Sequence, residues 1–475
     1  MEKSFISRSI RPRGRRAAVL PLVFAATAAL LAAALLAAAE PGDAAPPRRR
    51  AAAHRSPPNV VLVTVDTLRA DRLSGYGYER PTSPAIDRLL AGGATFEQAR
   101  TVEPLTNPAC SSMLTSLHPH EHGATRNGLR MRPNLGSLPK ELDRRGYQTA
   151  AFVANWTLKD RISGLGEHFD VFEEVFTRKR WLGLFASEAT AEDVNEAAIA
   201  WLDAHAGRRR PVFLWVHYVE PHAPYELHER MARRIGVAKN GASKSDRYDT
   251  EVAYVDQAVG ALVRRIEGDR RLAGNTLVAF TSDHGESLGE HDYWGHGRHL
   301  YEPGLRIPLA YWWPGRIRPQ RVEAPATILD LPPTVLGLLD HAVPDGFRGF
   351  DWSGVLAGTA RPDPERRTWY QAHKGAVLSI QEAGPARKDG LLELAMVTGT
   401  RKEIVQVNQR EHYVFDLSRD PGERRNLNGA GYRPSDPLAE WMSKVEAMLT
   451  AADDAPAVNI DAEDVEKLKA LGYID

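Results

Sequence analysis

Short runs of apolar residues alternate with amphipathic stretches along most of the chain. Residues 60–63 (VVLV) form a continuous apolar run, typical of a strand that is buried on both faces of a sheet. Similar runs occur at residues 149–153, 212–216 and 276–280. Buried strands separated by helices indicate an α/β protein whose central sheet is mostly parallel and covered by helices. Between the last two runs, spacings of three and four predict one apolar helix face: Val252, Val255, Val259, Leu262 and Ile266.

The last part of the chain has a different pattern. Residues 412–415 (HYVF) and their surroundings predict a small strand-rich unit, and residues near 437–450 predict a closing helix. At 475 residues the chain is longer than one hydrophobic core usually serves. We therefore expect a large domain over residues 59–365 and a C-terminal subdomain over residues 366–475 that packs on it.

The N-terminus has the pattern of an export segment. Five arginines lie between Arg8 and Arg16, and an uncharged, alanine-rich run over residues 17–39 follows them. As a helix, this run would extend roughly 35 Å, enough to cross a bilayer core of roughly 30 Å. It also ends in three alanines, which signal peptidase accepts. A cleaved signal peptide and a membrane anchor over residues 1–39 both remain open, followed by an Ala/Pro/Arg-rich tether over residues 40–58. Both predict a protein in the periplasm or on the outer face of the inner membrane.

Composition excludes some classes of protein. Lys+Arg and Asp+Glu both total 61, so the net charge is near zero, and we expect no nucleic-acid partner. Cys110 is the single cysteine, which excludes an internal disulfide and a cysteine-rich zinc site.

Candidate metal ligands follow three of the predicted strands. Asp66 follows the first, His217 and His222 lie at the end of the third, and Asp283-His284 follows the fourth. In a parallel sheet the ligand site lies at the carboxyl ends of the strands, so these residues are expected to converge there. An aspartate after a strand is also a common helix N-cap, and this alternative stays open for Asp66.

Four blocks of sequence resemble, in order and spacing, those of the sulfatase family in the alkaline phosphatase superfamily. The resemblance covers nearly all of the chain after the tether. It implies an alkaline-phosphatase-like sandwich in which residues 59–365 form the catalytic domain. The blocks are residues 59–77 (NVVLVTVDTLRADRLSGYG), 114–123 (LTSLHPHEHG), 282–303 (beginning SDHGESLGEH) and 415–427 (FDLSRDPGERRNL).

The resemblance also implies the nucleophile. The family places it at the start of a helix, nine residues before a threonine that corresponds to Thr115, and this position is Thr106. Sulfatases proper have a cysteine or serine there, which is converted to formylglycine, so no formylglycine is expected here. Cys110 is the alternative, but its neighbours lack the conversion motif, and we expect it to pack inside the helix. Thr106 is expected to be the N-cap, with Pro108 in the first turn, so that free N–H groups face a bound anion.

One divalent cation is implied, with Asp66, Thr106, Asp283 and His284 as its ligands. Oxygen ligands with one imidazole suit Mg²⁺, Ca²⁺ or Mn²⁺ better than a structural zinc. Where the family usually has a second aspartate, this chain has Thr67, so the choice among these metals stays open.

Other positions match residues that contact the substrate in relatives. His222 matches the histidine of an Asp-Pro-His-x-Pro block, and His296 stands where many relatives carry a lysine; both are assigned catalytic roles. Asn127 and Arg298 are assigned to substrate binding. The Lys-Trp-His block of relatives with arylsulfatase activity is replaced by residues 153–157 (VANWT), which removes one sulfate contact.

The expected function is metal-dependent hydrolysis of a sulfate or phosphate ester on a glycan, a lipid head group or a small molecule. A threonine nucleophile favours a phosphoester or phosphonate ester, whereas family membership alone favours a sulfate ester. A transferase that passes the group to a lipid or glycan is one alternative. An anion-binding pseudoenzyme is another alternative. A pseudoenzyme is expected to have lost metal ligands, whereas Asp66, Asp283 and His284 are all present. The membrane would be a further partner if the N-terminal segment is not cleaved.

Overall fold

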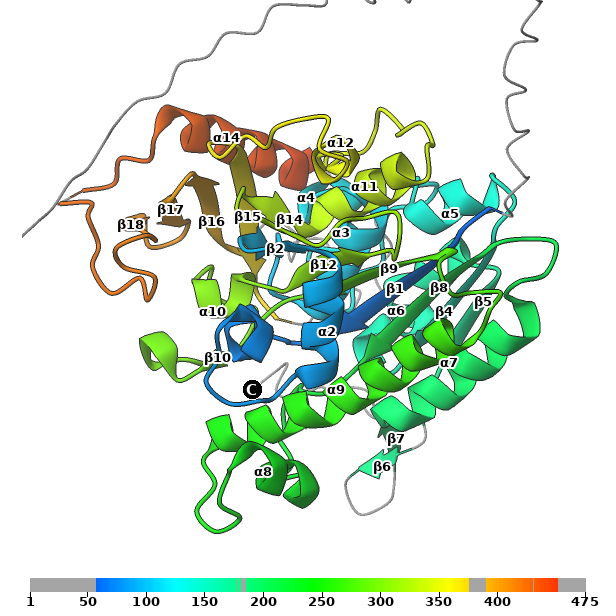
Figure 1. Ribbon diagram of the computed structural model, residues 1–475. Coiled ribbons are helices and arrows are strands. Elements are labelled where there is room, and N and C mark those ends of the chain that lie inside the picture. Colours follow the sequence, from blue (N-terminus) through cyan, green and yellow to red (C-terminus); the bar gives the residue numbers. More distant parts are fainter. Residues whose placement is uncertain (1–56, 177, 181–184, 376–389, 430, 452–475) are drawn as a thin grey trace, which may run out of the picture. The chain divides into compact units, whose positions relative to one another are not determined.

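The computed structural model describes residues 57–176, 178–180, 185–375, 390–429 and 431–451. Its centre is an eight-stranded sheet in the order β13-β2-β12-β9-β1-β8-β4-β5. The five strands from β9 to β5 are parallel, and β12 is antiparallel to both of its neighbours. The predicted mostly parallel sheet is therefore confirmed (Figure 1). The strands are β1 (Asn59–Val65), β2 (Ala94–Phe96), β4 (Gln148–Val153), β5 (Val171–Glu174), β8 (Val212–Tyr218), β9 (Thr276–Ser282), β12 (Leu309–Trp312) and β13 (Gln320–Val322).

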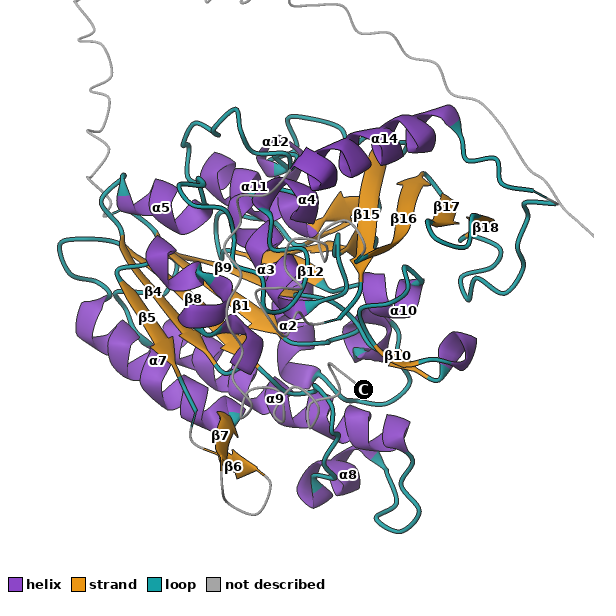
Figure 2. Cartoon of the chain, turned by 180° about the vertical axis from the view of Figure 1, so that it is seen from behind, coloured by secondary structure: helices purple, strands orange, loops and turns teal. Residues whose placement is uncertain are grey.

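Two hydrophobic cores lie on the two faces of this sheet. Because strand side chains alternate between faces, Val61 and Val63 of β1 belong to one core, and Val60 and Leu62 belong to the other. Burying each of these side chains contributes roughly 1.5–3 kcal/mol, which makes β1 a rigid support for the residues that follow it. Helices α2 (Pro84–Gly92), α7 (Ala191–His205) and α9 (Lys244–Gly268) cover the first face, and α3 (Thr106–Thr115), α5 (Leu138–Asp143) and α11 (Leu331–Leu338) cover the second (Figures 1 and 2).

A second sheet follows the first along the chain. Its antiparallel strands are β15 (Arg367–His373), β16 (Leu391–Thr398), β17 (Arg401–Gln406) and β18 (Glu411–Asp416). Helix α14 (Asp436–Ala451) packs Leu438 and Val445 against this sheet. The predicted strand-rich unit and closing helix are both confirmed. The domain boundary after residue 365 stays a prediction.

Buried charges join the second sheet to the loops of the first. Lys402 of β17 lies 3.0 Å from Glu302 and 2.7 Å from Glu423, and Arg100 lies 2.9 Å from Glu302. All four side chains are almost fully buried. A buried charge left without its partner is strongly destabilising, so this group holds the two sheets in one arrangement. The shorter elements near it and around the site are β3 (Ala99–Arg100), α4 (Pro119–His122), β10 (Ser287–Leu288), β11 (Trp294–Gly295), α10 (Glu302–Leu305), β14 (Ala326–Thr327) and α12 (Ser353–Leu356).

The predicted export segment and most of the tether lie outside the described residues, which begin at Pro57. Within the described part of the chain, no helix is long and apolar enough to cross a membrane.

Candidate active site and metal centre

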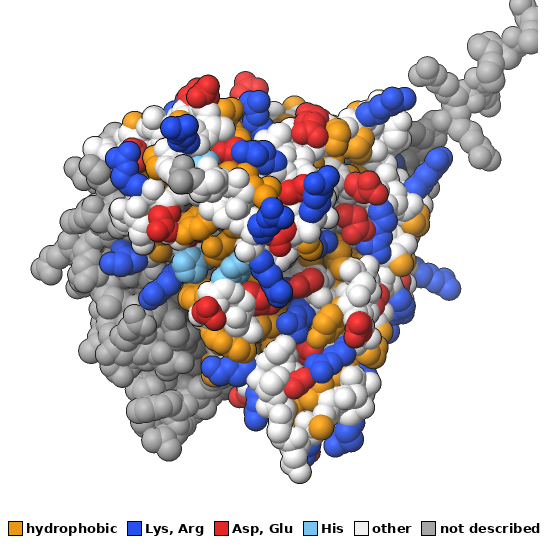
Figure 3. All heavy atoms as spheres, turned by 90° about the vertical axis from the view of Figure 1, so that its left-hand side faces the viewer, with side chains coloured by type: hydrophobic (Ala, Val, Ile, Leu, Met, Phe, Trp, Pro, Cys, Tyr) orange, Lys and Arg blue, Asp and Glu red, His pale blue; other side chains and the backbone are white. Residues whose placement is uncertain are grey.

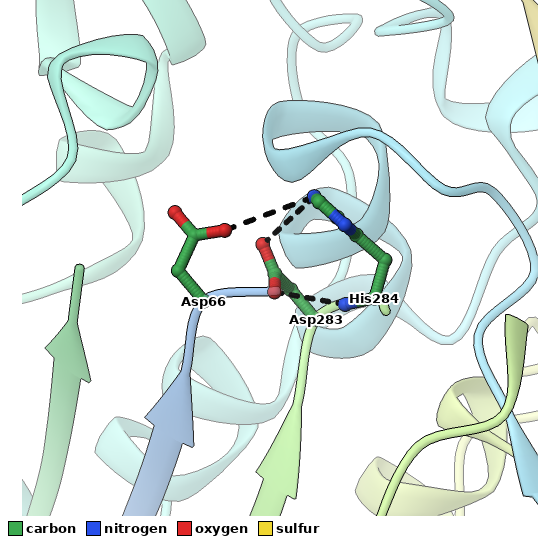
Figure 4. A group of neighbouring side chains, drawn as sticks. All are labelled: Asp66, Asp283 and His284. Atoms are coloured by element: carbon green, nitrogen blue, oxygen red, sulfur yellow. Dashed lines mark hydrogen bonds and ion pairs between the residues drawn. The ribbon is translucent and has the colours of Figure 1, made fainter. Parts of the chain in front are cut away.

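Two neighbouring strands of the central sheet bring three candidate ligands together. Asp66 follows β1, and Asp283 and His284 follow β9, whose Ser282 pairs with Val65 of β1. One carboxylate oxygen from each aspartate and one ring nitrogen of His284 lie within 4.8 Å of one another (Figure 4). All three residues are fully buried. The structure therefore brings together residues that are separated by more than two hundred positions in the sequence, as the strand pattern predicts.

The protonation of His284 shows what this cluster can hold. Its Nδ1 lies 2.9 Å from the carbonyl oxygen of Gly285, which can only accept, so Nδ1 carries the proton and Nε2 carries a lone pair. That lone pair faces Asp283 Oδ2 at 3.5 Å and Asp66 Oδ1 at 3.8 Å. Three electron-rich atoms that face one another in a buried site repel unless positive charge lies among them. These residues therefore fit a divalent cation bound by oxygen and imidazole ligands.

The pKa values of the cluster residues also support a cation site. Burial, together with the negative charge of Asp66, raises the pKa of Asp283 to about 6. Burial lowers the pKa of His284 to about 4. Asp283 Oδ2 accepts no hydrogen bond from any described residue. A bound cation would favour the ionised carboxylate and the neutral imidazole, which are the forms that bind metal.

Thr106 is the first residue of α3. The predicted N-cap position is wrong: the N-cap is Leu105, whose carbonyl accepts the first helical hydrogen bond from Ala109 at 2.9 Å. Because Leu105 has extended backbone angles and Thr106 is already helical, the threonine hydroxyl does not cap the helix. It lies instead 3.2 Å from His284 Nε2. Thr106 thus joins the cluster formed by the two aspartates and the histidine.

Cys110 lies one turn further along α3 and packs in the hydrophobic core on that face of the sheet. Its thiol is fully buried, and burial raises its pKa well above the usual range. A thiol in this environment is held as the neutral, unreactive form.

The two histidines with predicted catalytic roles lie beside the cluster. The ring of His296 is 4.5 Å from that of His284 and 5.2 Å from that of His222, measured between centroids. Its Nδ1 lies 3.1 Å from Glu286 Oε1, and burial lowers its pKa to about 4. The Nδ1 of His222 donates to the carbonyl of Ala223 at 2.7 Å.

Of the two predicted substrate-binding residues, Asn127 lies beside Thr106, whereas Arg298 lies next to the second sheet. Asn127 Oδ1 accepts the backbone N–H of Asn107 at 3.1 Å, which fixes the asparagine to the start of α3, beside Thr106. Its Nδ2 is buried and makes no hydrogen bond within the described residues. Arg298 is exposed, and it lines a hollow of about 260 Å³ that it forms with the second sheet.

Two residues outside the implied ligand set contact Asp66. Asn155 is not singled out in the sequence, whereas His217 is expected at this sheet edge as a candidate metal ligand. Asn155 Oδ1 accepts both the N–H and the hydroxyl of Thr157 at 2.8 Å, so its Nδ2 faces Asp66 Oδ2, to which it donates a hydrogen bond. His217 Nε2 lies 3.6 Å from the same oxygen. The sequence signal for a role at this site is the position of both residues at strand ends. Asn155 follows β4, and His217 of β8 pairs with Thr64 of β1. Residues 153–157 are therefore more than a lost sulfate contact, because they supply a support for Asp66.

Comparisons with known proteins agree on one family. The family model described as Sulfatase matches residues 58–341. Human arylsulfatase A is 27% identical over 470 residues, covering 84% of this chain and 89% of that protein. Canine N-acetylgalactosamine-6-sulfatase is 25% identical, covering 85% of this chain and 88% of that protein.

Solved structures with the same fold are more distant in sequence. A protein solved in complex with its substrate D-glucosamine-2-N,6-O-disulfate has a TM-score of 0.66 at 19% identity, covering 84% of this chain and 99% of that one. The phosphonate monoester hydrolase of Agrobacterium radiobacter has a TM-score of 0.62 at 19% identity, covering 82% and 96%. These likenesses confirm the alkaline-phosphatase-like α/β fold.

Proposed function

The chain belongs to the sulfatase family, and from this premise we propose that it is a metal-dependent hydrolase of anionic esters with Thr106 as its nucleophile. One observation carries the proposal. Thr106 Oγ1 lies 3.2 Å from His284 Nε2, in a buried cluster that Asp66 and Asp283 complete. A hydroxyl in contact with a metal-type cluster is the arrangement that a threonine needs to act as a nucleophile.

Asp66, Asp283, His284 and Thr106 would hold one divalent cation, either Mg²⁺, Ca²⁺ or Mn²⁺. When bound, the cation supplies positive charge that lowers the pKa of a neighbouring hydroxyl and stabilises negative charge on the ester. Helix α3 adds to this effect, because its N-terminus points positive partial charge at the same place. Asn127, fixed to the start of α3, orients the ester oxygens through its Nδ2 group.

The reaction has two steps. Thr106 Oγ1 loses its proton to solvent and forms a bond to sulfur or phosphorus as the bond to the leaving alcohol breaks, and water then cleaves the Thr106 ester and restores the hydroxyl. The leaving oxygen needs a proton. The Nδ1–H of His222 is committed to the Ala223 carbonyl, so only a doubly protonated His222 has an Nε2–H to give. Glu286, which contacts His296, also lies close enough to interact electrostatically with His222.

The charge of the site favours an ester with a single negative charge. The family resemblance puts lysines where this chain has residues 153–157 and His296, so fixed positive charge is reduced here. A phosphodiester, a phosphonate monoester or a sulfate ester carries one negative charge, whereas a phosphate monoester carries nearly two at neutral pH. Because formylglycine is not expected, we place phosphodiesters and phosphonate monoesters ahead of sulfate esters.

The names of relatives support an anionic ester on a sugar as the substrate. One relative is named N-acetylgalactosamine-6-sulfatase, and one solved relative holds a disulfated glucosamine as its substrate. We propose the same chemical class, an anionic ester on a sugar or a similar polyol, for this chain.

A hydrolysis screen tests the proposal. The full-length protein is assayed with p-nitrophenyl sulfate, p-nitrophenyl phosphate, a p-nitrophenyl phosphodiester and a p-nitrophenyl phosphonate, each with Mg²⁺, Ca²⁺ and Mn²⁺. We expect turnover of a singly charged ester that Thr106→Ala abolishes. Transfer of the group to added glycerol in preference to water would favour the transferase. Binding of the esters without turnover by any metal form would favour the pseudoenzyme.

We also propose that the protein works outside the cytoplasm, on the basis of the basic and alanine-rich N-terminal sequence. A reporter that is active only after export, fused after Pro58, should be active. Activity of a cytoplasm-only reporter at the same position would contradict export.

A further inference from the structure

Glu286 is a fully buried carboxylate beside the two histidines that have predicted catalytic roles. It lies two residues after His284 and directly before β10, the first strand of the hairpin that β10 and β11 form. His296 comes directly after β11, the second strand of this hairpin. Glu286 Oε1 lies 3.1 Å from His296 Nδ1, so the residues on the two sides of the hairpin contact each other across its base.

This contact determines which nitrogen of His296 is presented to a substrate. An ionised carboxylate only accepts hydrogen bonds, so Glu286 takes the Nδ1–H of the imidazole. Nε2 lies on the other side of the ring and is then the nitrogen that acts on the ester, whether it carries a lone pair or a proton. In histidines generally, the hydrogen bond of one ring nitrogen sets the state of the other, and a carboxylate is a common partner for this purpose.

Glu286 is itself held in place by Arg69. Arg69 Nη1 donates to the backbone carbonyl of Glu286 at 3.0 Å and to Glu290 Oε1 at 2.8 Å. Its Nε and Nη2 donate to the two carboxylate oxygens of Asp71 at 2.8 and 2.7 Å, so all three nitrogens of the guanidinium are engaged within the protein. A bidentate pair of this kind is specific in geometry. Arg69 therefore fixes the backbone at Glu286 rather than reaching toward a substrate.

The backbone of His296 is also fixed on its other side. Tyr293 donates its hydroxyl to the carbonyl of His296 at 2.7 Å. Gly297 has a φ of +92°, and a Cβ added to it would lie 2.6 Å from Leu105 Cδ2, so this loop packs directly against the residue before Thr106. Because the backbone is held, the orientation of the imidazole depends on the contacts of its ring.

Exposed charges add little to that orientation. Basic and acidic side chains are mixed over the described face in Figure 3, and charges on the surface are screened by salt. Glu286 and Arg69 are buried instead. A hydrogen bond to an ionised group is roughly twice as strong as one between neutral groups, so the buried carboxylate is the stronger influence on His296.

Two other buried glutamates contact histidines that have no predicted catalytic role. Glu103 Oε1 accepts the backbone N–H of His373 at 2.9 Å, and Glu103 Oε2 lies 2.8 Å from His373 Nδ1. This pair joins the segment before Thr106 to β15 of the second sheet. Glu403 Oε2 lies 3.2 Å from His412 Nε2, and both residues belong to the second sheet. The pair within the second sheet therefore provides a matched control.

We propose that Glu286 is a positioning residue that holds His296 with Nδ1 bound and Nε2 presented to the ester. The inference deepens the proposed function and rests on it, since it takes the ester to react at Thr106 with His296 beside it. The effect of Glu286 on turnover then passes through His296, and it is absent from a protein that lacks this histidine.

A double-mutant cycle tests this route. Turnover of the ester found by the hydrolysis screen is measured for full-length Glu286→Ala, His296→Gln and the double variant, with folding checked by circular dichroism. A positioned acid or base typically contributes 10²–10⁴-fold, so we expect Glu286→Ala to lower kcat about 100-fold in the wild-type background. In the His296→Gln background the same change should cost no more than about twofold. Glu286→Gln, which keeps an acceptor oxygen, should recover part of the loss, and Glu403→Ala should have an equal effect in both backgrounds.

Nuclear magnetic resonance gives a readout that needs no turnover. The His296 side chain is only 8% exposed and its Nδ1–H is hydrogen-bonded, so this proton should be protected from exchange with solvent in the wild-type protein. Its resonance is assigned by its absence from His296→Gln. Glu286→Ala should remove the resonance, and Glu403→Ala should leave it in place.

The outcomes separate this inference from the proposed function. A kcat loss in Glu286→Ala that persists in His296→Gln, or a resonance that Glu286→Ala leaves in place, overturns the positioning role while the hydrolysis screen can still succeed. A resonance lost in Glu286→Ala and kept in Glu403→Ala supports the role even if no ester is hydrolysed. Should Glu286→Ala fail to fold, Glu286→Gln decides by the same cycle: a loss that disappears in His296→Gln supports the role, and an equal loss in both backgrounds overturns it.

Discussion

His284 Nε2 lies 3.2 Å from the hydroxyl oxygen of Thr106 and carries a lone pair, because Nδ1 donates to Gly285. The same nitrogen faces Asp283 Oδ2 at 3.5 Å. One atom therefore connects the candidate nucleophile to the candidate metal ligands. Substitutions on either side of it should have separable effects on chemistry and on metal binding.

We predict that Thr106→Ala removes nearly all turnover and weakens metal binding without abolishing it. Thr106→Ser should keep partial activity, since a hydroxyl remains at the start of α3. Cys110→Ser should keep activity and cost on the order of 1 kcal/mol of stability, because a buried residue is exchanged for a near-isostere. Rates on the ester found by the screen, with folding checked by circular dichroism, measure these effects. Activity lost in Cys110→Ser and kept in Thr106→Ala would reverse the assignment.

Metal binding should depend on Asp283. A divalent cation that binds the folded state alone stabilises it by about 2.7 kcal/mol at one hundred times its Kd. We therefore expect Mn²⁺ or Mg²⁺ to raise the denaturation midpoint of the wild-type protein and EDTA to reverse the change. Asp283→Asn should show no such increase. Asp256→Asn is the control, because Asp256 is a buried carboxylate bound to the backbone N–H groups of Ala85 and Ile86. An equal loss in both variants would mean that the effect is not specific to the cluster.

The supports of Asp66 should affect affinity for the metal more than the fold. Asn155 and His217 both contact Asp66 Oδ2 and so hold its other oxygen toward His284. Losing such a support typically lowers metal affinity 10–100-fold, and we expect this of His217→Gln and Asn155→Ala, measured by calorimetry. His412→Gln is the control, because His412 is also a buried histidine and contacts Glu403 in the second sheet. Unchanged affinity in both test variants would show that Asp66 does not need them.

Gly297 offers a test of how closely the His296 loop packs on the nucleophile segment. Gly297→Ala would place a methyl group against Leu105 and should lower kcat, because both His296 and Thr106 are displaced. Gly315 also has a positive φ, of +77°, but nothing lies within 4 Å of its added Cβ. Gly315→Ala therefore carries the backbone strain alone, and its kcat should match that of the wild type. Equal losses in the two variants would attribute the effect to strain.

Stability should fall in mild acid because of buried neutral histidines. Burial lowers the pKa of His168 to about 3, and its Nδ1 lies 2.7 Å from Ser137 Oγ. Below a pH of about 6.5 the unfolded chain binds a proton that the folded chain excludes, so stability is complete above that pH and decreases toward pH 3. At pH 4.5 this one group can cost about 2.7 kcal/mol. His168→Gln should reduce the difference between urea midpoints at pH 7.5 and pH 4.5, and an unchanged difference would exclude His168 as a cause.

Much of the fold could be predicted because strands that are buried in a parallel sheet consist of continuous runs of apolar residues. Residues 60–63 and 276–280 mark β1 and β9, and the ligands directly after them follow from sheet geometry. The start of α3 was predicted one residue too late. Leu105 caps the helix with its backbone only, and that leaves no side-chain signature in the sequence.

The role of Asn155 could not be assigned from the sequence, and His217 could be named only as a candidate metal ligand, for a different reason. Their roles depend on which strands are neighbours in the sheet, and β4 and β8 follow β1 in space in an order that differs from their order in the chain. The hollow lined by Arg298 and Lys374 is hidden in the same way, since its walls come from segments about seventy-five residues apart.

The bond between Glu103 and His373 also affects how the protein is made. Glu103 leaves the ribosome 270 residues before His373. At about 5–20 residues per second, the carboxylate waits roughly 15–50 s for its partner. Until then, the strand that pins the segment before Thr106 does not exist, and α3 lacks part of the packing that holds its first residue in place. The nascent catalytic half is therefore synthesised without this contact, which can form only after translation has entered the last quarter of the chain.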